Sequence, residues 1–372
     1  MRKTINIGDL GTIITGKTPP TTNKNYYGDY AVFIKPTDIS EQSKYTYETE
    51  EMYSKLAAEK YESSLIPKGA ICVPCIGTIG TKMTMTPCDC YTNQSINSII
   101  CNENYDNEYV YYLIKNFLPG LKAYNLGTAS GREYVSKSNF EKIELVAEQD
   151  QEIQKKIGII LSRYDSLIEN YQKQIKLLEE AAQRLYKEWF VDLRFPGHEN
   201  TKIVDGVPEG WTPSQLGQLA EFKRGKTITK KDVIDGDIPV VAGGLEPAYY
   251  CNKSNTAERV ITISGSGANA GFTRMYFEKV WASDCSFVDA SVTPFLHFVY
   301  CYLKANKTTI DNMQKGAAQP HVYAKDINSL SICIPIESVL KSFEGTASKY
   351  FDTISSFQSQ IRLLTEARDR LL

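Results

Sequence analysis

The sequence contains no long apolar run and no excess of charge of either sign. No window approaches the roughly 20 consecutive apolar residues that a membrane span needs, and Met1, Arg2 and Lys3 lead into no apolar signal segment. We therefore expect a cytoplasmic protein. The formal net charge of −2 argues mildly against a chain that binds DNA unaided, because such a chain is usually basic.

Cysteine and histidine are too few to indicate a disulfide scaffold or a catalytic centre. The nine cysteines among 372 residues are odd in number, which, without a signal segment, indicates reduced thiols. The three histidines are scattered and form no metal-binding or catalytic spacing with one another. They are His198, His297 and His321.

Motifs for methyl transfer are also missing. A nucleic-acid methyltransferase needs an Asn/Asp-Pro-Pro-Tyr/Phe motif to hold the target amine, and the only Pro-Pro pair, residues 19–20, is flanked by threonines. Residues 265–270 imitate a dinucleotide-binding glycine loop, but residues 272–277 are typical of a strand, whereas such a loop requires a helix there. A tight turn between strands is the favoured interpretation, and a backbone contact to DNA is an alternative. The sequence therefore predicts that the chain is not an enzyme.

The longest regular stretch runs from Gln151 to Phe190 and is predicted to form one helix. Its apolar residues recur at alternating spacings of four and three, which is typical of the seam of a coiled coil. These residues are Ile157, Leu161, Tyr164, Ile168, Tyr171, Ile175, Leu178, Ala182, Leu185 and Trp189. Charged residues lie between them, so the seam needs an apolar partner elsewhere in the chain.

The last part of the chain supplies a second copy of this helix. A shift of 186 positions aligns residues 174–178 with residues 360–364, and Arg184 with Arg370. Agreement in both pattern and identity indicates a repeat, although two unrelated amphipathic helices are the alternative. We predict an antiparallel coiled coil between the two helices. Its interface residues are Leu161, Tyr164, Ile168, Tyr171, Ile175, Leu178, Leu185, Tyr350, Ile354, Phe357, Ile361, Leu364 and Leu371.

The segments in front of the two helices also repeat. Residues 16–18 recur as residues 225–227 at an offset of 209, and Gln94 corresponds to Asp284 at an offset of 190. A falling offset indicates internal deletions within a true repeat. Short strand-like runs separated by Gly, Pro and Asn turns, with a few helical pieces, predict two mixed α/β domains. The predicted segments are a first domain at 1–147, a central helix and linker start at 148–195, a linker and second domain at 196–336, and a C-terminal helix at 337–372.

Four cysteines lie close together in the first domain. Cys72, Cys75, Cys88 and Cys90 have a spacing that a structural zinc site tolerates. The second domain has no counterpart to them, although an element essential to a shared scaffold should be present in both copies. Buried cysteines on strands are therefore the favoured interpretation, with zinc as the alternative.

The segment between the first helix and the second domain carries the most specific sequence signal. It reads Trp-Phe-Val-Asp-Leu-Arg-Phe-Pro-Gly at residues 189–197 and Gly-Val-Pro-Glu-Gly-Trp at residues 206–211. Together with the order domain, helix, domain, helix, this stretch resembles the DNA-specificity (S) subunit of type I restriction-modification systems. In that family a similar helix end, Pro-Gly turn and Pro-Glu-Gly-Trp entry lead to the second target-recognition domain.

The resemblance implies a chain that selects a DNA site and leaves the chemistry to its partners. Each target-recognition domain would read one half of a bipartite site in double-stranded DNA. Two modification subunits carrying S-adenosylmethionine would methylate adenine N6, and two restriction subunits would act as motor and nuclease. We accordingly expect no cofactor on this chain and no membrane partner. An interaction scaffold that does not touch DNA is the competing hypothesis, and an enzyme is the weakest.

Polar loop side chains in each domain are candidate DNA contacts, because Lys, Arg, Ser and Thr hold phosphates while major-groove base edges are distinguished by hydrogen bonds. The candidates in the first domain are Lys17, Thr18, Lys35, Thr37, Gln94, Arg132 and Tyr134. Those in the second domain are Lys226, Thr227, Asn269, Arg274, Lys315, Gln319 and His321. Salt-dependent binding of duplex DNA would distinguish a DNA reader from a scaffold.

Overall fold

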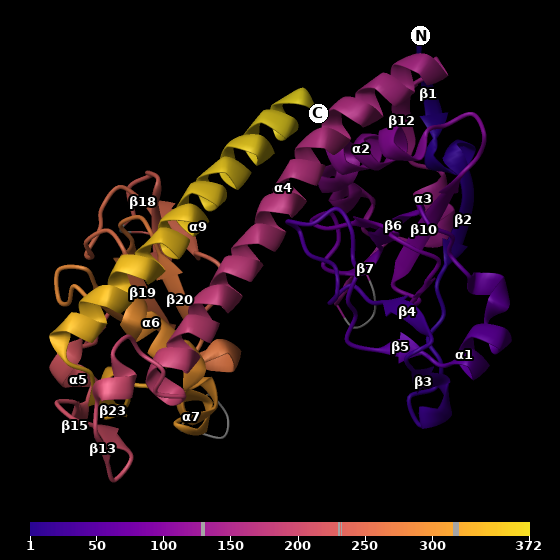
Figure 1. Cartoon of the computed structure of the whole chain (residues 1–372). Helices are drawn as coiled ribbons and strands as arrows, with labels where there is room; N and C mark the ends of the chain where they lie inside the picture. Colours follow the sequence, from indigo (N-terminus) through magenta and orange to yellow (C-terminus); the bar gives the residue numbers. More distant parts are fainter. Residues whose placement is uncertain (128–130, 230, 232, 315–319) are drawn as a thin grey trace. The chain divides into compact units, whose positions relative to one another are not determined.

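The computed structural model describes residues 1–127, 131–229, 231, 233–314 and 320–372. The chain divides into two compact units. Unit 1 consists of Met1–Tyr171 with Gln360–Leu372, and unit 2 of Gln172–Ser359. Each unit combines a mixed α/β globule with part of each of two long helices (Figure 1). In the part of the chain that the structure describes, no helix combines the length and apolar content needed to cross a membrane.

Unit 1 is built from short strands, most of them antiparallel. One sheet has the order β2 (Gly11–Thr15), β10 (Ile96–Cys101), β6 (Ile71–Pro74), β8 (Thr84–Met85). A second has the order β3 (Tyr27–Gly28), β5 (Met52–Tyr53), β4 (Ala31–Ile34), β9 (Tyr91–Thr92), in which β4 and β9 are parallel. Two strand pairs complete the set: β1 (Arg2–Asn6) with β12 (Glu144–Glu148), and β7 (Ile76–Gly77) with β11 (Glu133–Tyr134).

Three short helices accompany these strands: α1 (Lys55–Lys60), α2 (Asn107–Phe117) and α3 (Lys137–Glu141). Asp106 caps α2 by accepting a hydrogen bond from the Tyr109 backbone N–H at 3.0 Å. The buried side of α2 is aromatic and includes Tyr111 and Tyr112, which pack into the main core of unit 1. This helix therefore joins the sheet of unit 1 to the long helices.

Unit 2 repeats the plan of unit 1. Its main sheet has the order β16 (Lys223–Arg224), β22 (Cys285–Asp289), β19 (Val260–Ser264), β20 (Thr273–Tyr276). The remaining strands are β15 (Thr212–Gln215) with β23 (Ser331–Ile334), β18 (Tyr249–Cys251) with β17 (Ile238–Val241) and β21 (Trp281–Ala282), and the hairpin β13 (Ile203–Val204) with β14 (Val207–Pro208). Its short helices are α5 (Leu216–Leu219), α6 (Leu296–Ala305), α7 (Lys307–Asn312) and α8 (Ala324–Asn328).

The repeat extends to strand register. The parallel pair Phe33 and Tyr91 in unit 1 has its counterpart in Val240 and Trp281 of unit 2. The strand that follows the glycine-rich residues 265–270 is present as β20, so that segment leads into a strand and not into a helix. The prediction of two repeated mixed α/β domains is confirmed.

The two long helices are α4 (Gln151–Tyr186), extended by a π-helical turn over Lys187–Val191, and α9 (Glu337–Leu371). In unit 1, Arg368 of α9 contacts Asp165 of α4, and the later Leu372 lines the same cavity as the earlier Leu161. In unit 2, the ring centroids of Trp189 and Phe343 are 5.8 Å apart. Within each unit, therefore, a late segment of one helix meets an early segment of the other, as an antiparallel pair requires.

Candidate nucleic-acid interface

The loop after β2 in unit 1 is held against the opposite strands by its own backbone. The Gly16 N–H donates to the carbonyl oxygen of Ile96 at 3.2 Å, and the Lys17 N–H to that of Thr92 at 2.9 Å. The Tyr53 hydroxyl donates to the Lys17 carbonyl oxygen at 2.6 Å. These bonds fix the backbone and leave the Lys17 side chain exposed.

The equivalent loop after β16 in unit 2 has the same bonds. The Gly225 N–H donates to the carbonyl oxygen of Cys285 at 2.8 Å, and the Lys226 N–H to that of Ala282 at 2.9 Å. Here the indole N–H of Trp281 donates to the Lys226 carbonyl oxygen at 2.7 Å, in place of the tyrosine hydroxyl. The two units thus present a lysine from the same backbone geometry.

Glycine is required at the first position of both loops because the backbones approach too closely for a side chain. A Cβ atom on Gly16 would lie 2.1 Å from the carbonyl oxygen of Thr92. A Cβ atom on Gly225 would lie 2.4 Å from that of Ser283. The repeated glycine in the sequence therefore reports a repeated close approach of strands.

In unit 1, three of the predicted DNA contacts come together at this loop. Lys17, Thr18 and Gln94 are all exposed, and the Thr18 hydroxyl donates to the side-chain oxygen of Gln94 across the loop. A Gln amide can bond both the donor and the acceptor on the major-groove edge of adenine, while Lys and Thr can hold phosphate oxygens. The cluster therefore combines a base-reading group with two positioning groups.

In unit 2, the corresponding position is charged. Arg224 forms an ion pair with Asp284, and the Ser266 hydroxyl donates to the other oxygen of that carboxylate. Ser266 also forms a β-bridge with the predicted contact His321. Arg224, Ser266 and Asp284 were not among the sequence-based candidates, although the correspondence between Gln94 and Asp284 pointed to this place.

Residues 11–18 match the letters of a Gly-x-x-x-x-Gly-Lys-Thr phosphate loop, but they do not have its structure. Such a loop follows a strand and opens a helix. Here Gly11–Thr15 is itself the strand β2, paired with β10, and Pro19 and Pro20 follow without an intervening helix. The match is therefore no evidence of nucleotide binding.

The Lys35 side chain of unit 1 forms ion pairs with two neighbouring carboxylates. Its ammonium group lies 2.7 Å from Glu50 and 3.2 Å from Glu51. Burial alone would lower the pKa of Lys35, but the two glutamates outweigh it and raise the pKa. The remaining candidates of unit 1 are exposed or half-buried: Thr37, Arg132 and Tyr134.

Arg274 of unit 2 is held in place by acceptors and an aromatic ring. Its guanidinium donates to the Leu245 carbonyl oxygen at 2.9 Å and to the Glu246 carboxylate at 3.2 Å, and it lies 4.9 Å from the ring centroid of Tyr276. Burial lowers its pKa, but Tyr276 and Glu246 outweigh that and raise it. Thr227 is exposed and Asn269 half-buried, whereas Lys315 and Gln319 lie outside the described residues.

The residues predicted for the helix pair differ widely in burial. Three are buried: Leu161, Ile168 and Ile354. Nine are half-buried: Tyr164, Tyr171, Ile175, Leu178, Leu185, Tyr350, Phe357, Ile361 and Leu364. Leu371 is 57% exposed, because it lies in the last turn of α9. The apolar pattern also passed over two buried charged residues on the same helices, Asp165 and Arg368.

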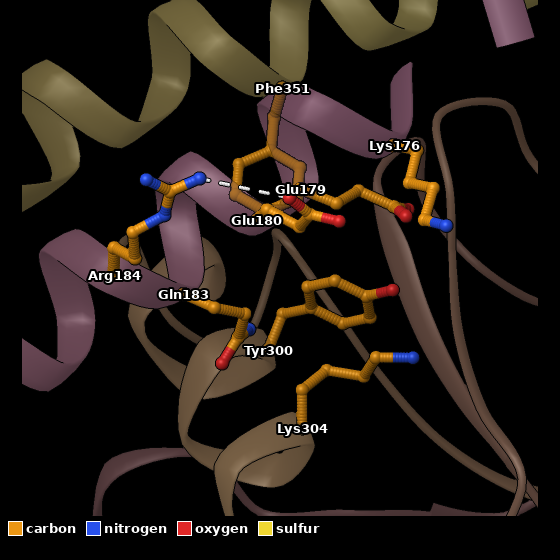
Figure 2. A pocket seen from close by; sticks show the side chains of 8 residues that line it. All are labelled: Lys176, Glu179, Glu180, Gln183, Arg184, Tyr300, Lys304 and Phe351. Atoms are coloured by element: carbon orange, nitrogen blue, oxygen red, sulfur yellow. Dashed lines mark ion pairs between the residues drawn. The ribbon is translucent and has the colours of Figure 1, made fainter. Parts of the chain in front are cut away.

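Unit 2 contains an open, mainly apolar hollow of about 440 Å³ beside α4 and α6. Figure 2 shows Tyr300 and Lys304 of α6 below Lys176 and Glu179 of α4, with Phe351 of α9 in the upper part of the view. Desolvation raises the pKa of Glu179, although Lys304 and Arg274 act in the opposite direction. The hollow mixes both signs of charge and does not define a ligand class.

The four clustered cysteines of unit 1 occupy different environments. Cys72 and Cys75 are buried, and burial raises the pKa of each thiol to about 12. Cys90 is buried and Cys88 exposed. Among the residues that the structure describes, no group of three or more His, Cys, Asp and Glu side chains is arranged to hold a metal ion.

Comparison with known families gives a match in both units. The model of the type I restriction modification DNA specificity domain matches residues 2–180 and 208–370. These two ranges correspond to the two repeats found in the sequence, including the long helix after each. The matched region therefore contains both candidate interfaces.

Individual relatives carry the same description. The chain is 27% identical to the type I restriction enzyme MjaIX specificity subunit of Methanocaldococcus jannaschii, over 98% of this chain and 90% of that protein. It is 37% identical to the HindI specificity subunit of Haemophilus influenzae over 42% of this chain and 35% of that protein. The fold is similar to the crystal structure of a type I S subunit from M. genitalium, with a TM-score of 0.59, 16% identity and coverage of 100% and 95%.

Proposed function

The chain belongs to the type I restriction modification DNA specificity family, and from this we propose that it reads a bipartite site in double-stranded DNA. Unit 1 would read one half-site and unit 2 the other. Membership of this family supports the role in DNA recognition within a type I system. The assignment of one half-site to each unit is our inference from the internal repeat.

The observation that supports this assignment is the repeated loop with different side chains. Both units hold a lysine by the same pair of backbone hydrogen bonds, to Thr92 in one and to Ala282 in the other. Beside that lysine, unit 1 presents Gln94 and unit 2 presents the Arg224 and Asp284 pair. A constant scaffold with a variable polar group is what reading two different half-sites requires.

The chemistry of these groups suggests what each half-site contains. A Gln amide pairs well with adenine, whereas an Arg guanidinium pairs best with guanine. In unit 2, Asp284 orients Arg224 and would reduce the entropy that is lost on binding. We therefore expect adenine near Gln94 and guanine near Arg224.

The reaction itself would be carried out by partners. We expect two modification subunits that bring S-adenosylmethionine and methylate adenine N6, and two restriction subunits that move and cut DNA. The chain would hold no cofactor and catalyse no step. Equilibrium dialysis of the purified chain against labelled S-adenosylmethionine tests this, and saturable one-to-one uptake would contradict it.

Mapping of methylated adenines tests the half-site assignment. Residues 1–145 are exchanged for the same domain of a relative, and the exchanged chain is expressed with its modification partner. One half of the methylated sequence should change while the other half stays. A change in both halves together would contradict independent reading by the two units, and duplex binding that does not depend on salt would argue against phosphate contacts.

The helix pair would set the gap between the half-sites. At 1.5 Å per residue, a four-residue insertion near Lys173 adds about 6 Å, close to two base pairs, and keeps the seam nearly in phase. The same adenine mapping should then show a longer unread gap with unchanged halves. An active complex with an unchanged gap would mean that another element sets the distance.

A further inference from the structure

A buried polar cluster lies where α4 and α9 meet in unit 1. We call Tyr112, Asp165 and Arg368 the Asp165 cluster. Asp165 and Arg368 are only 4% and 7% exposed, and their side chains form an ion pair. The Tyr112 hydroxyl, from α2, donates to the second carboxylate oxygen of Asp165 at 2.5 Å. Both oxygens of the buried carboxylate are therefore satisfied.

The same three positions of unit 2 are apolar. The shift of 186 that relates the helices makes Phe351 the counterpart of Asp165 and Ala182 the counterpart of Arg368, and an offset of 189 between α2 and α6 makes Cys301 the counterpart of Tyr112. All three lie in one buried cluster of unit 2. Phe351 stacks on His297 with ring centroids 4.7 Å apart, and Cys301 lies 4.0 Å from the Ala182 carbonyl oxygen.

This difference matters because the two helices share several seam residues: Tyr164 recurs as Tyr350, Ile168 as Ile354 and Leu178 as Leu364. A second copy of α4 could make the contacts that α9 makes through these shared residues. Two copies of the chain could then exchange helices, so that α4 pairs with α4 and α9 with α9. The seam residues that the two helices share do not distinguish that dimer from the pair of α4 with α9.

The charges do exclude it. A pair of two α4 helices in the observed register would set Asp165 of each copy against Ala182 of the other, which leaves two buried carboxylates without a cation. A pair of two α9 helices would set Arg368 against Phe351, which removes the buried carboxylate of Asp165 and leaves each guanidinium only the half-exposed Asp369 of its own helix, 2.7 Å away. Removing one partner of a buried ion pair is strongly unfavourable. Only α4 with α9 matches charge with charge at one end and apolar with apolar at the other.

We propose that Tyr112, Asp165 and Arg368 are specificity determinants of helix pairing, which make α4 pair with α9 and reject the α4 of a second copy. The Asp165 cluster disfavours the pairing of α4 with α4 more than it stabilises the pairing of α4 with α9. Because the Asp165 cluster contains none of the residues proposed to contact DNA, this role does not depend on the proposed DNA reading.

Four full-length chains in reducing buffer test the proposal. They vary whether the two ends of the helix pair are alike separately from whether those ends are polar or apolar. The first is the natural chain. The second, Tyr112→Cys with Asp165→Phe and Arg368→Ala, makes both ends apolar. The third, Ala182→Arg with Cys301→Tyr and Phe351→Asp, makes both ends polar. The fourth carries all six changes and so moves the cluster to unit 2, which serves as the matched control.

Each chain is refolded at about 1 mM, the order of the effective concentration that a short tether provides. Light scattering after size exclusion then gives the mass relative to the 41.9 kDa monomer. We expect the natural chain and the six-change chain to be monomeric, because their ends differ. Both three-change chains should form dimers at a level at least tenfold higher.

Three outcomes would overturn the proposal. The first is an equal dimer fraction in all four chains. The second is a dimer fraction that follows the urea midpoint of each chain and not the symmetry of its ends. The third is failure of both three-change chains to fold by circular dichroism, because the three positions would then be needed for folding and not for the choice of partner. If only one of the two three-change chains folds, its dimer fraction is compared with that of the natural chain, and an equal fraction overturns the proposal.

Discussion

Units 1 and 2 share backbone bonds more closely than they share side chains. The N–H groups of Lys17 and Lys226 bond equivalent carbonyl oxygens at 2.9 Å in both units, yet Tyr53 supports one loop and Trp281 the other. A scaffold defined by strand register tolerates this variation, because backbone groups must be paired whatever the side chains are. The polar groups beside the loop are then free to differ between the units.

The first turns of α2 and of its counterpart α6 are capped by side chains from different places in the chain. In unit 1, Asp106, which directly precedes α2, accepts a hydrogen bond from the Tyr109 N–H. In unit 2, α6 has no side-chain cap of its own, and Glu344 of α9 accepts from the equivalent Phe298 N–H at 2.9 Å. The equivalent of Glu344 in α4 is Gly158, where a Cβ would lie 2.8 Å from Glu108. A local cap in one unit is thus replaced by a tertiary one in the other.

The largest expected effect concerns the Asp165 cluster, which only unit 1 has. Arg368→Ala should lower the free energy of unfolding by about 3–5 kcal/mol, because Asp165 stays buried without its cation. Urea denaturation followed by circular dichroism measures this. The exposed Arg370→Ala on the same helix is the control and should stay within about 0.5 kcal/mol. Equal losses in the two variants would contradict the assigned burial.

A second pair of changes tests whether the two loops are truly equivalent. Gly16→Ala and Gly225→Ala should each cost about 1–3 kcal/mol, because the new methyl group meets a backbone oxygen in both units. Thermal and urea unfolding give the values. Gly345→Ala is the matched control, since nothing lies within 4 Å of its Cβ position and the residue is within α9, so it should stabilise by up to about 1 kcal/mol. A large difference between the two loop variants would mean that the units use the glycine differently.

A third pair separates the half-sites. Gln94→Leu should reduce discrimination at one base position by about 1–3 kcal/mol and leave the other half-site intact, and Arg224→Leu should do the reverse. Binding of the complex with its modification partner to duplexes altered at single positions measures this. The exposed Gln358→Leu on α9 should change neither half. Loss of affinity without loss of discrimination would assign both side chains to phosphate contacts.

The smallest effect tests the two caps. Asp106→Ala and Glu344→Ala should each cost about 0.5–2 kcal/mol, because each removes the acceptor at the start of a helix. The loss caused by Glu344→Ala should include a second contribution, because the Glu344 carboxylate also lies 2.7 Å from Nδ1 of His297. His297→Phe should therefore reduce the loss caused by Glu344→Ala in a double-mutant cycle. Strict additivity would show that the His297 contact contributes nothing.

Much of the architecture was predictable because its determinants are local. The alternating spacing of apolar residues predicted α4 and α9, and the coincident identities after a shift of 186 positions predicted the repeat. The repeated Gly-Lys-Thr predicted equivalent loops, which the structure confirms by the close approach at Gly16 and Gly225. The assignment of individual DNA contacts stays a prediction.

Other features depended on residues that are distant in the chain. Asp165 and Arg368 are separated by 203 positions, and a pattern that searches for apolar seam residues passes over both. Arg224 and Asp284, 60 positions apart, meet only because β16 and β22 pair. Periodicity and turn chemistry act between neighbours and can be read from the sequence, whereas the partner of a buried charge is decided by which elements pack together. The sequence by itself therefore determined two repeated domains and two helices, and the tertiary structure decided which charges those helices bury and pair.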